Sequence, residues 1–171
     1  MGGLGGLRRG AWSALALAAL ALPACDRETP AQRAQKTNDR VQIELAEVRA
    51  STPPADALKL LNQIVLPFAP GSVEIPEQAQ PVLTAAARAI DRLPKGTRLH
   101  VTGHTDDSEE AGLGLSLGLQ RAAAVVDFLY ANGAPTDKVS AIGVGSQRPL
   151  AAEKTEDGRA RNRRVEFKIA D

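Results

Sequence analysis

The stretch Val101-Thr102-Gly103-His104-Thr105-Asp106 decides the fold that this sequence predicts. The short apolar run over residues 99–101 ends in Thr-Gly and a burst of polar residues, a pattern typical of a buried strand that ends in a loop. Farther along, the apolar residues follow helical spacing, at Leu115, Leu119, Ala122, Val126 and Leu129. The segment therefore predicts one strand–loop–helix unit.

Two charged residues of this unit form a candidate site. Asp106 lies in the predicted loop, and Arg121 follows it by fifteen positions, at the border of the apolar stripe of the helix. A carboxylate and a guanidinium on successive elements suit a zwitterion, such as an amino-acid head group. The alternative is a structural ion pair that steadies the loop, and the residues by themselves favour that alternative.

The rest of the chain predicts strands that alternate with helices. We expect strands over 64–68, 98–102, 139–144 and 164–169, helices over 77–93 and 116–131, and a long loop over 145–157. Pro67 limits pairing, so the first strand should lie at an edge or end early. These elements predict an α/β (α+β) sandwich, with helices packed on a four-stranded sheet.

The first 24 residues have the features of a secretory signal peptide. Arg8 and Arg9 precede an apolar run over residues 11–22, which is too short to span a bilayer. The run ends in Leu22-Pro23-Ala24-Cys25, and small residues before a lone cysteine resemble the bacterial lipobox. We expect Cys25 to become the lipidated N-terminus; the alternative is an ordinary cleavage site followed by a free thiol. Acyl chains on Cys25 would anchor the protein to a membrane.

Residues 25–57 are expected to form the lipidated N-terminus and a flexible tether. Residues 26–39 are polar and show no apolar period, and a short amphipathic helix is expected to follow through Ala50. The predicted domain comprises residues 58–171, and we expect it to fold without the tether. The outer membrane is the first expected location of the protein. The inner membrane is the second, because Asp26 resembles the residue that retains some lipoproteins there.

Composition excludes several classes of function. The formal charge of the chain is +1 and aromatic residues are 3%, so neither a basic field nor stacking rings for nucleic acid are present. One cysteine excludes an internal disulfide. No nucleophile–base pair stands out around the two histidines, and His104 with Asp106 and Asp107 makes only a weak case for a metal. We expect a non-catalytic protein without cofactor or metal.

Several motifs together resemble the OmpA-like domain of peptidoglycan-associated lipoproteins and outer membrane protein A. They are Gly103-His104-Thr105-Asp106, Leu117 with Arg121-Ala122, Gly143-Val144-Gly145 with Pro149, Gly158-Arg159-Ala160, and Asn162-Arg163-Arg164-Val165-Glu166. Their order and spacing make the resemblance specific over about residues 64–169. It implies a βαβαββ domain whose mixed sheet has the order 1-4-2-3, with the last strand between the first two.

The resemblance also implies a ligand, the diaminopimelate of the peptidoglycan stem peptide. In that family the motif Asp contacts the amino end of the ligand and the helix Arg pairs with its carboxylate. Those roles would fall to Asp106 and Arg121, with Arg163 supporting them and Thr105 in the same site. The protein would then tie the membrane to the cell wall and face the periplasm.

The sequence departs from the family pattern at several positions near this site. Glu109 stands where the family usually has Gly, Gly114 where it has Asn, and Gly118 where it has Ser. The turn after Phe68 ends in Gly71 instead of the usual Asn. The alternative function is therefore an OmpA-like scaffold that has lost peptidoglycan binding and contacts other envelope proteins.

Overall fold

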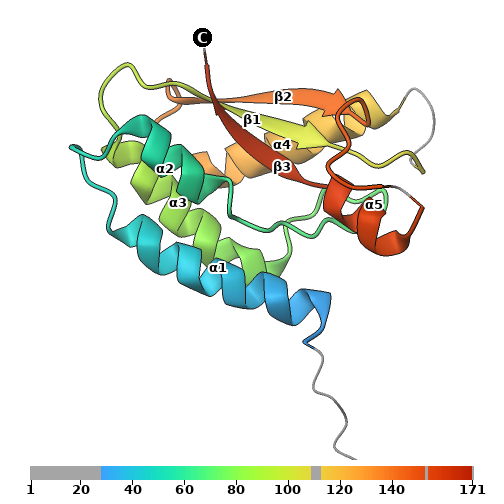
Figure 1. The fold of residues 1–171 in the computed structure, drawn as a ribbon. Coiled ribbons are helices and arrows are strands. Elements are labelled where there is room, and N and C mark those ends of the chain that lie inside the picture. Colours follow the sequence, from blue (N-terminus) through green and yellow to red (C-terminus); the bar gives the residue numbers. More distant parts are fainter. Residues whose placement is uncertain (1–27, 109–112, 153, 171) are drawn as a thin grey trace, which may run out of the picture.

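The computed structural model describes residues 28–108, 113–152 and 154–170, so the predicted signal peptide and Cys25 lie outside the described residues. The helices are α1 (Pro30–Ala46), α2 (Pro54–Leu61), the 3₁₀ turn η1 (Glu77–Ala79), α3 (Gln80–Arg92), α4 (Gly114–Ala131) and α5 (Glu156–Asn162) (Figure 1). The strands are β1 (Leu99–His104), β2 (Val139–Gly145) and β3 (Val165–Ile169). None of the described helices is both long and apolar enough to cross a bilayer.

The described strands form one mixed sheet in the order β2-β1-β3. The central strand β1 pairs in parallel with β2 and antiparallel with β3, with Val101 opposite Ala141 on one side and Phe167 on the other. The last strand thus lies beside the strand that precedes the Asp106 loop, as the family order implied. Helix α4 forms the crossover between the parallel strands β1 and β2.

The predicted strand over residues 64–68 is not formed, so four strands are not found in the described part of the chain. The segment is extended, but side chains take the place of a strand partner. The amide of Asn38 donates to the carbonyl of Val65 and accepts from its N–H, both at 2.9 Å. Pro67 has no N–H to contribute to a ladder, and Arg163 donates to the carbonyl of Phe68. The prediction was therefore wrong because these polar side chains satisfy the backbone.

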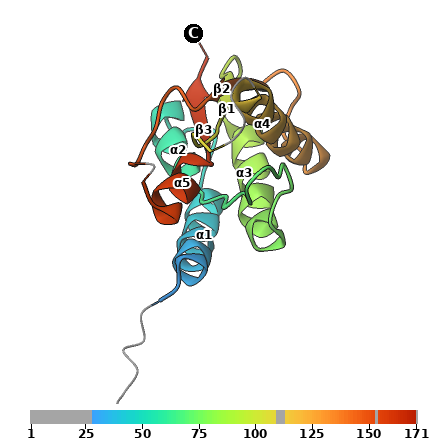
Figure 2. The same ribbon diagram turned by 90° about the vertical axis from the view of Figure 1, so that its right-hand side faces the viewer.

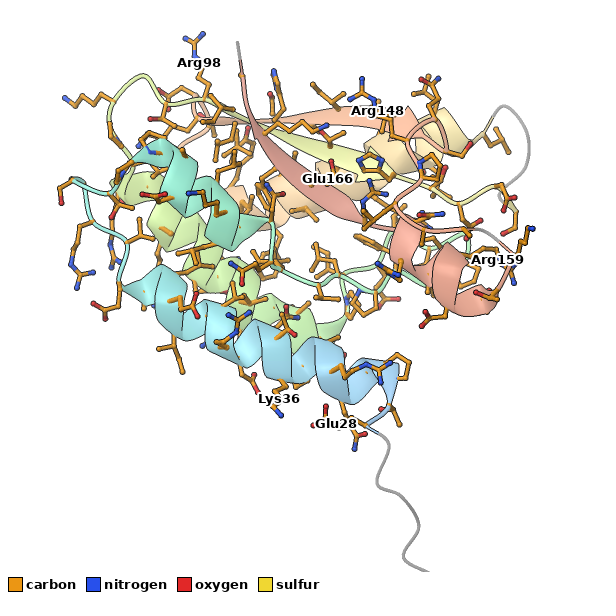
Figure 3. All side chains as sticks on the ribbon, in the orientation of Figure 1. Glu28, Lys36, Arg98, Arg148, Arg159 and Glu166 are labelled. Carbon is orange, nitrogen blue, oxygen red and sulfur yellow. The ribbon has the colours of Figure 1, made fainter. Side chains whose placement is uncertain are left out.

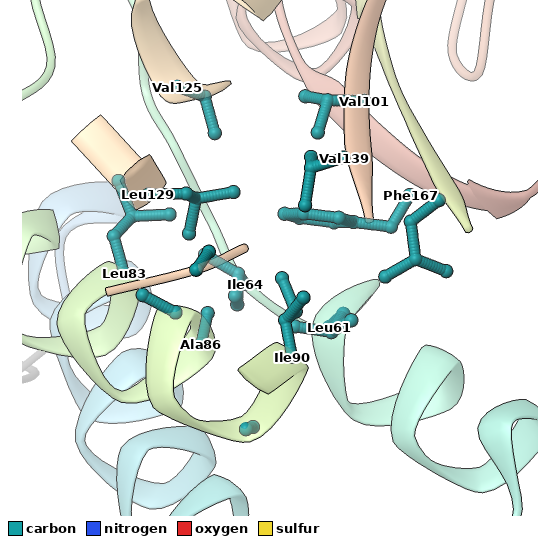
Figure 4. Packing of buried hydrophobic residues seen from close by; sticks show 14 of the residues in the cluster. Leu61, Ile64, Leu83, Ala86, Ile90, Val101, Val125, Leu129, Val139 and Phe167 are labelled. Atoms are coloured by element: carbon teal, nitrogen blue, oxygen red, sulfur yellow. The ribbon is translucent and has the colours of Figure 1, made fainter. Parts of the chain in front are cut away.

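The hydrophobic core lies between the sheet and the helices. Figure 1 shows the sheet above α2 and α3 with α1 farthest from it, and Figure 2 shows α4 beside β1 and β2. The core is mostly aliphatic, with two buried aromatic rings, Phe68 and Phe167. The close view in Figure 4 shows part of it, including Leu61, Ile64, Leu83, Ala86, Ile90, Val101, Val125, Leu129, Val139 and Phe167. The predicted helix over 77–93 is confirmed, with Pro81 in the first turn of α3.

The flexible tether predicted before residue 58 is instead largely helical where it is described. Thr29 and Gln32 form a capping box that starts α1. Val41 and Leu45 of α1 are fully buried, and Val48 after the helix is 2% exposed. The short amphipathic helix expected through Ala50 agrees in part with α1, which starts earlier and ends at Ala46. The polar composition before residue 40 hid the first turns of the helix, because only one narrow apolar face packs on α3. We therefore no longer expect the domain to fold unaffected by removal of these residues.

Candidate functional site

The predicted site residues meet at the C-terminal end of β1. The Asp106 loop follows β1, the turn at residues 69–72 lies beside it, and α4 begins nearby. Helix α5, which replaces part of the long loop expected over 145–157, brings Arg163 to the same place. The Thr155 side chain caps this helix by accepting from the Gly158 N–H at 3.1 Å.

Asp106 is 1% exposed, and both of its carboxylate oxygens are occupied. Oδ1 accepts from the N–H of Ser108 at 2.9 Å and from its hydroxyl at 2.6 Å, and Oδ2 accepts from Nη1 of Arg163 at 2.5 Å. Burial acts to raise the pKa of Asp106, but the hydrogen bonds from Ser108 and Arg163 outweigh it and lower the pKa below its ordinary value. The carboxylate is therefore ionised and held by internal donors.

Arg163 connects three parts of the chain. Its Nε donates to the carbonyl of Phe68 at 3.1 Å, and its Nη2 donates to Oε1 of Glu156 at 2.5 Å. Burial acts to lower the pKa of Arg163, but Glu156 and Asp106 together raise it. The prediction that Arg163 lies with Asp106 agrees with this geometry. Of the rest of the basic run, Arg161 is exposed and Arg164 pairs with Glu166, while Figure 3 shows Arg159 reaching outward from α5.

Arg121 is fully buried and braces the neighbouring loops. Its guanidinium donates to the carbonyls of Ser72 at 2.9 Å, Ala69 at 3.2 Å and His104 at 3.3 Å. It also lies 5.3 Å from the ring centre of Phe68, within cation–π range. In the described part of the chain, Asp106 pairs with Arg163 and not with Arg121. The expected Asp106–Arg121 pairing across one strand–loop–helix unit is thus replaced by a pair from distant segments.

The glycines that depart from the family pattern are needed for close packing. A Cβ atom on Gly118 would lie 2.6 Å from the Gly103 carbonyl oxygen, so α4 rests directly on β1. A Cβ atom on Gly114 would lie 2.9 Å from Oγ1 of Thr105. Thr105 is 1% exposed, and its hydroxyl makes no hydrogen bond with the residues that are described. Both glycines therefore let the start of α4 approach the strand and the loop.

His104 is fully buried on the opposite face of the sheet from the core residue Val101. Its Nε2 lies 3.4 Å from Oε2 of Glu166. Burial, with a smaller effect of Arg164, lowers the pKa of His104 to about 4, so the ring is neutral at pH 7. Among the described residues no three His, Cys, Asp or Glu side chains lie close enough together to hold a metal ion.

A pocket of about 450 Å³ lies in front of these buried groups. It is lined by Pro70, Gly71, Ser108, Leu113, Ser116, Leu117 and Gln120. Ser108 both lines the pocket and binds Asp106, so the pocket reaches the buried carboxylate through this one residue. Ser108 was not among the predicted site residues, although an Asp followed two residues later by Ser is a recognisable turn signal. Glu156 was not predicted either, because no local pattern marks it.

Comparisons with known proteins agree with this architecture. The pattern of the OmpA family matches residues 67–163. The peptidoglycan-binding protein ArfA of Mycobacterium tuberculosis is 32% identical over 123 residues, which are 70% of this chain and 37% of that protein. The peptidoglycan-associated lipoprotein of Brucella melitensis is 34% identical over 87 residues, 51% of each chain. The chain thus spans between about a third and a half of the length of these relatives.

Solved structures show the same fold. The crystal structure of the peptidoglycan-associated lipoprotein from Burkholderia pseudomallei superposes with a TM-score of 0.58 at 26% identity, covering 61% of this chain and 88% of that chain. The C-terminal domain of Helicobacter pylori MotB superposes with a TM-score of 0.59 at 26% identity, covering 63% and 83%.

Proposed function

The chain belongs to the OmpA family, as its motifs predicted, and on that premise we propose that it is a non-catalytic peptidoglycan-binding lipoprotein. The observation that carries the proposal is the pocket beside the family's motif Asp. The pocket opens between the turn at residues 70–71 and the start of α4, and Ser108 connects it to Asp106. The ligand proposed for it is the diaminopimelate of the stem peptide, which carries an ammonium and a carboxylate at its free end.

Binding in this pocket requires an exchange of hydrogen-bond donors. The Ser108 hydroxyl occupies Oδ1 of Asp106, so a ligand ammonium would replace that hydroxyl as the donor. The Ser108 bond is already charge-assisted because its acceptor is a carboxylate, so the exchange favours the ligand through the added attraction between the ammonium charge and the carboxylate charge. Arg121, with Arg163 behind it, supplies the positive charge that favours the ligand carboxylate, and Thr105 lies at the same end of β1. We assign Asp106, Arg121, Arg163 and Thr105 to peptidoglycan binding.

The lipid anchor is the second part of the proposal. Cys25 would carry the acyl chains, the helix α1 would follow within a few residues, and the domain would face the periplasm, with the outer membrane as the first expectation. Cys25→Ser should release the protein from membranes or stall its processing. Fractionation of the variant together with the wild type in the membrane would contradict the anchor and leave wall binding untouched.

One observation favours a second candidate function. Asp106 and Arg121 are both buried, and both already bind groups of the chain itself. This is the arrangement expected of an OmpA-like scaffold that keeps the motif for stability and contacts envelope proteins instead of the wall. The two candidates differ in whether the pocket is used.

A sacculus pull-down tests the proposal without disturbing the buried ions. Ser116 is exposed and lines the pocket, so Ser116→Trp should fill part of it and weaken binding to diaminopimelate-containing sacculi at least tenfold. Asp127→Trp is the matched control, because Asp127 is an exposed residue of the same helix that does not line the pocket. Wild-type protein that does not sediment with these sacculi would rule out wall binding and leave the scaffold function.

A further inference from the structure

A groove of about 850 Å³ runs along the outer edge of β3, away from the pocket beside Asp106. The start of α1 and the end of α2 line it together with the extended segment at 64–67 and residues of α5. Its walls include the buried apolar side chains of Ile64, Leu66 and Phe167. The groove therefore combines an apolar surface with a sheet edge that pairs with no other described strand and is exposed at Ile169.

The hydrogen-bonding pattern of β3 shows which backbone groups face the groove. Toward β1, the Arg164 carbonyl accepts from the His104 N–H at 2.8 Å, and the Ala170 N–H donates to the Arg98 carbonyl at 2.9 Å. In an antiparallel pair alternate residues point their backbone groups to opposite sides, so Val165, Phe167 and Ile169 point theirs away from β1. No described residue hydrogen-bonds the backbone of Val165 or Ile169.

The side chain of Asn62 hydrogen-bonds this edge in the way that the backbone of a neighbouring strand would. Asn62 accepts from the N–H of Phe167 at 2.7 Å and donates to its carbonyl at 2.9 Å. These are the two bonds that a residue of a neighbouring strand would make. The amide of Asn62 thus satisfies the central residue of the edge and leaves the residues on either side of it open.

The charged side chains along the groove indicate which charge a binding partner should carry. The ionisable groups among the described lining residues are four cations, Arg161, Arg163, Arg164 and Lys168, and one carboxylate, Glu166. Glu166 is already paired with Arg164 at 2.6 Å, and Arg163 is paired with Asp106 and Glu156. Arg161 is exposed just before the strand, and Lys168, near the other end, is 42% exposed and lies 3.4 Å from Glu166, which it shares with Arg164. A partner with apolar side chains and carboxylates would match both the apolar walls of the groove and its excess of cations.

We propose that this groove binds an extended peptide segment of another protein, which pairs with β3 as an added strand and carries alternating apolar and acidic side chains. The peptide backbone would bind Val165 and Ile169 and replace the Asn62 amide at Phe167, as in other cases of strand addition. Its apolar side chains would cover Ile64 and Leu66, and its carboxylates would meet Arg161 and Lys168. The proposal does not depend on peptidoglycan binding, because the groove and the pocket have no lining residue in common, and Arg163, which borders the groove, takes no part in the contacts proposed for the peptide.

Fluorescence anisotropy with a labelled peptide of alternating valine and glutamate tests the proposal on the purified full chain. The peptide should bind the wild type, and a matched peptide with lysine in place of glutamate should bind at least tenfold more weakly. Asn62→Ala should tighten binding several-fold, because it removes the internal competitor for Phe167. A loss of stability in this variant is measured separately by a thermal melt and does not change the sign of the binding effect in folded protein.

Charge reversal supplies the second arm of the test. The double variant Arg161→Glu with Lys168→Glu should weaken binding of the glutamate peptide about tenfold. Lys95→Glu, which changes an exposed cation outside the groove, should leave it unchanged. Absence of wild-type binding, equal binding of the two peptides, or weaker binding by the Asn62→Ala variant would each overturn the proposal. Sacculus binding should be the same in all these variants, which separates this result from the test of wall binding.

Discussion

Asp106→Asn tests whether the buried ion pair with Arg163 holds the site together. The substitution keeps the shape of the side chain and lets its oxygen accept from Ser108, but it turns an amide N–H₂ toward Nη1 of Arg163. Two donors then face each other, and the guanidinium, which is only 4% exposed, loses one of its two carboxylates. Removing one partner of a buried ion pair costs about 3–5 kcal/mol. Since Arg163 keeps Glu156, we expect about 3 kcal/mol at pH 7, the low end of that range.

The pH dependence of the difference in unfolding free energy between the wild type and Asp106→Asn identifies the cause of that difference. The pKa of Asp106 is lowered in the folded protein, so the carboxylate stabilises the fold above its unfolded pKa of about 3.9. That stability is lost as the pH falls through the folded value. The variant has no such carboxylate, so the gap between wild type and variant should be constant above about pH 5 and narrow below about pH 4.

Urea denaturation of both proteins at a series of pH values measures the gap. Asp127→Asn, an exposed carboxylate of α4, is the matched control and should change the free energy of unfolding by less than about 0.5 kcal/mol. A loss below about 1 kcal/mol at pH 7 would refute the inference that the pair is buried and important. A gap that stays the same at acidic pH would show that its origin is not the Asp106 charge.

Three further predictions follow from packing and burial. Leu45→Ala should cost about 2–5 kcal/mol in urea denaturation, because Leu45 is fully buried, whereas a tether residue would tolerate it. Gly118→Ala should cost about 1–3 kcal/mol of stability, since its Cβ atom would lie 2.6 Å from the Gly103 carbonyl oxygen. A melting temperature equal to that of the wild type would contradict the close contact between α4 and β1. The ring signals of His104 in NMR should not titrate between pH 7.5 and about pH 5, because burial lowers its pKa to about 4. Stability should fall as the pH drops from about 6.5 toward that value, where the unfolded chain binds the proton first.

Local patterns were sufficient for most of the regular elements. The apolar run before Gly103 became β1, the helical spacing after it became α4, and the alternation around Phe167 became β3. Each of these segments carries its own period of two or 3.6 residues, which depends only on neighbours in the chain. The OmpA-like motifs were visible for the same reason, and the family match bears them out.

The sequence by itself did not determine which groups the charged residues bind. It also did not determine the secondary structure of the first part of α1 or of residues 64–68. Spacing favoured Arg121 as the neighbour of Asp106, yet β3 pairs antiparallel with β1 and so carries Arg163 to the Asp106 loop from 57 positions away. Residues 30–39 look like a tether until α3 offers a surface on which α1 buries Val41 and Leu45. Residues 64–68 look like a strand until Asn38 satisfies the backbone at Val65. A polar group binds whichever partner the packed chain brings within about 3 Å, and that choice depends on strand register and helix packing, which no local pattern contains.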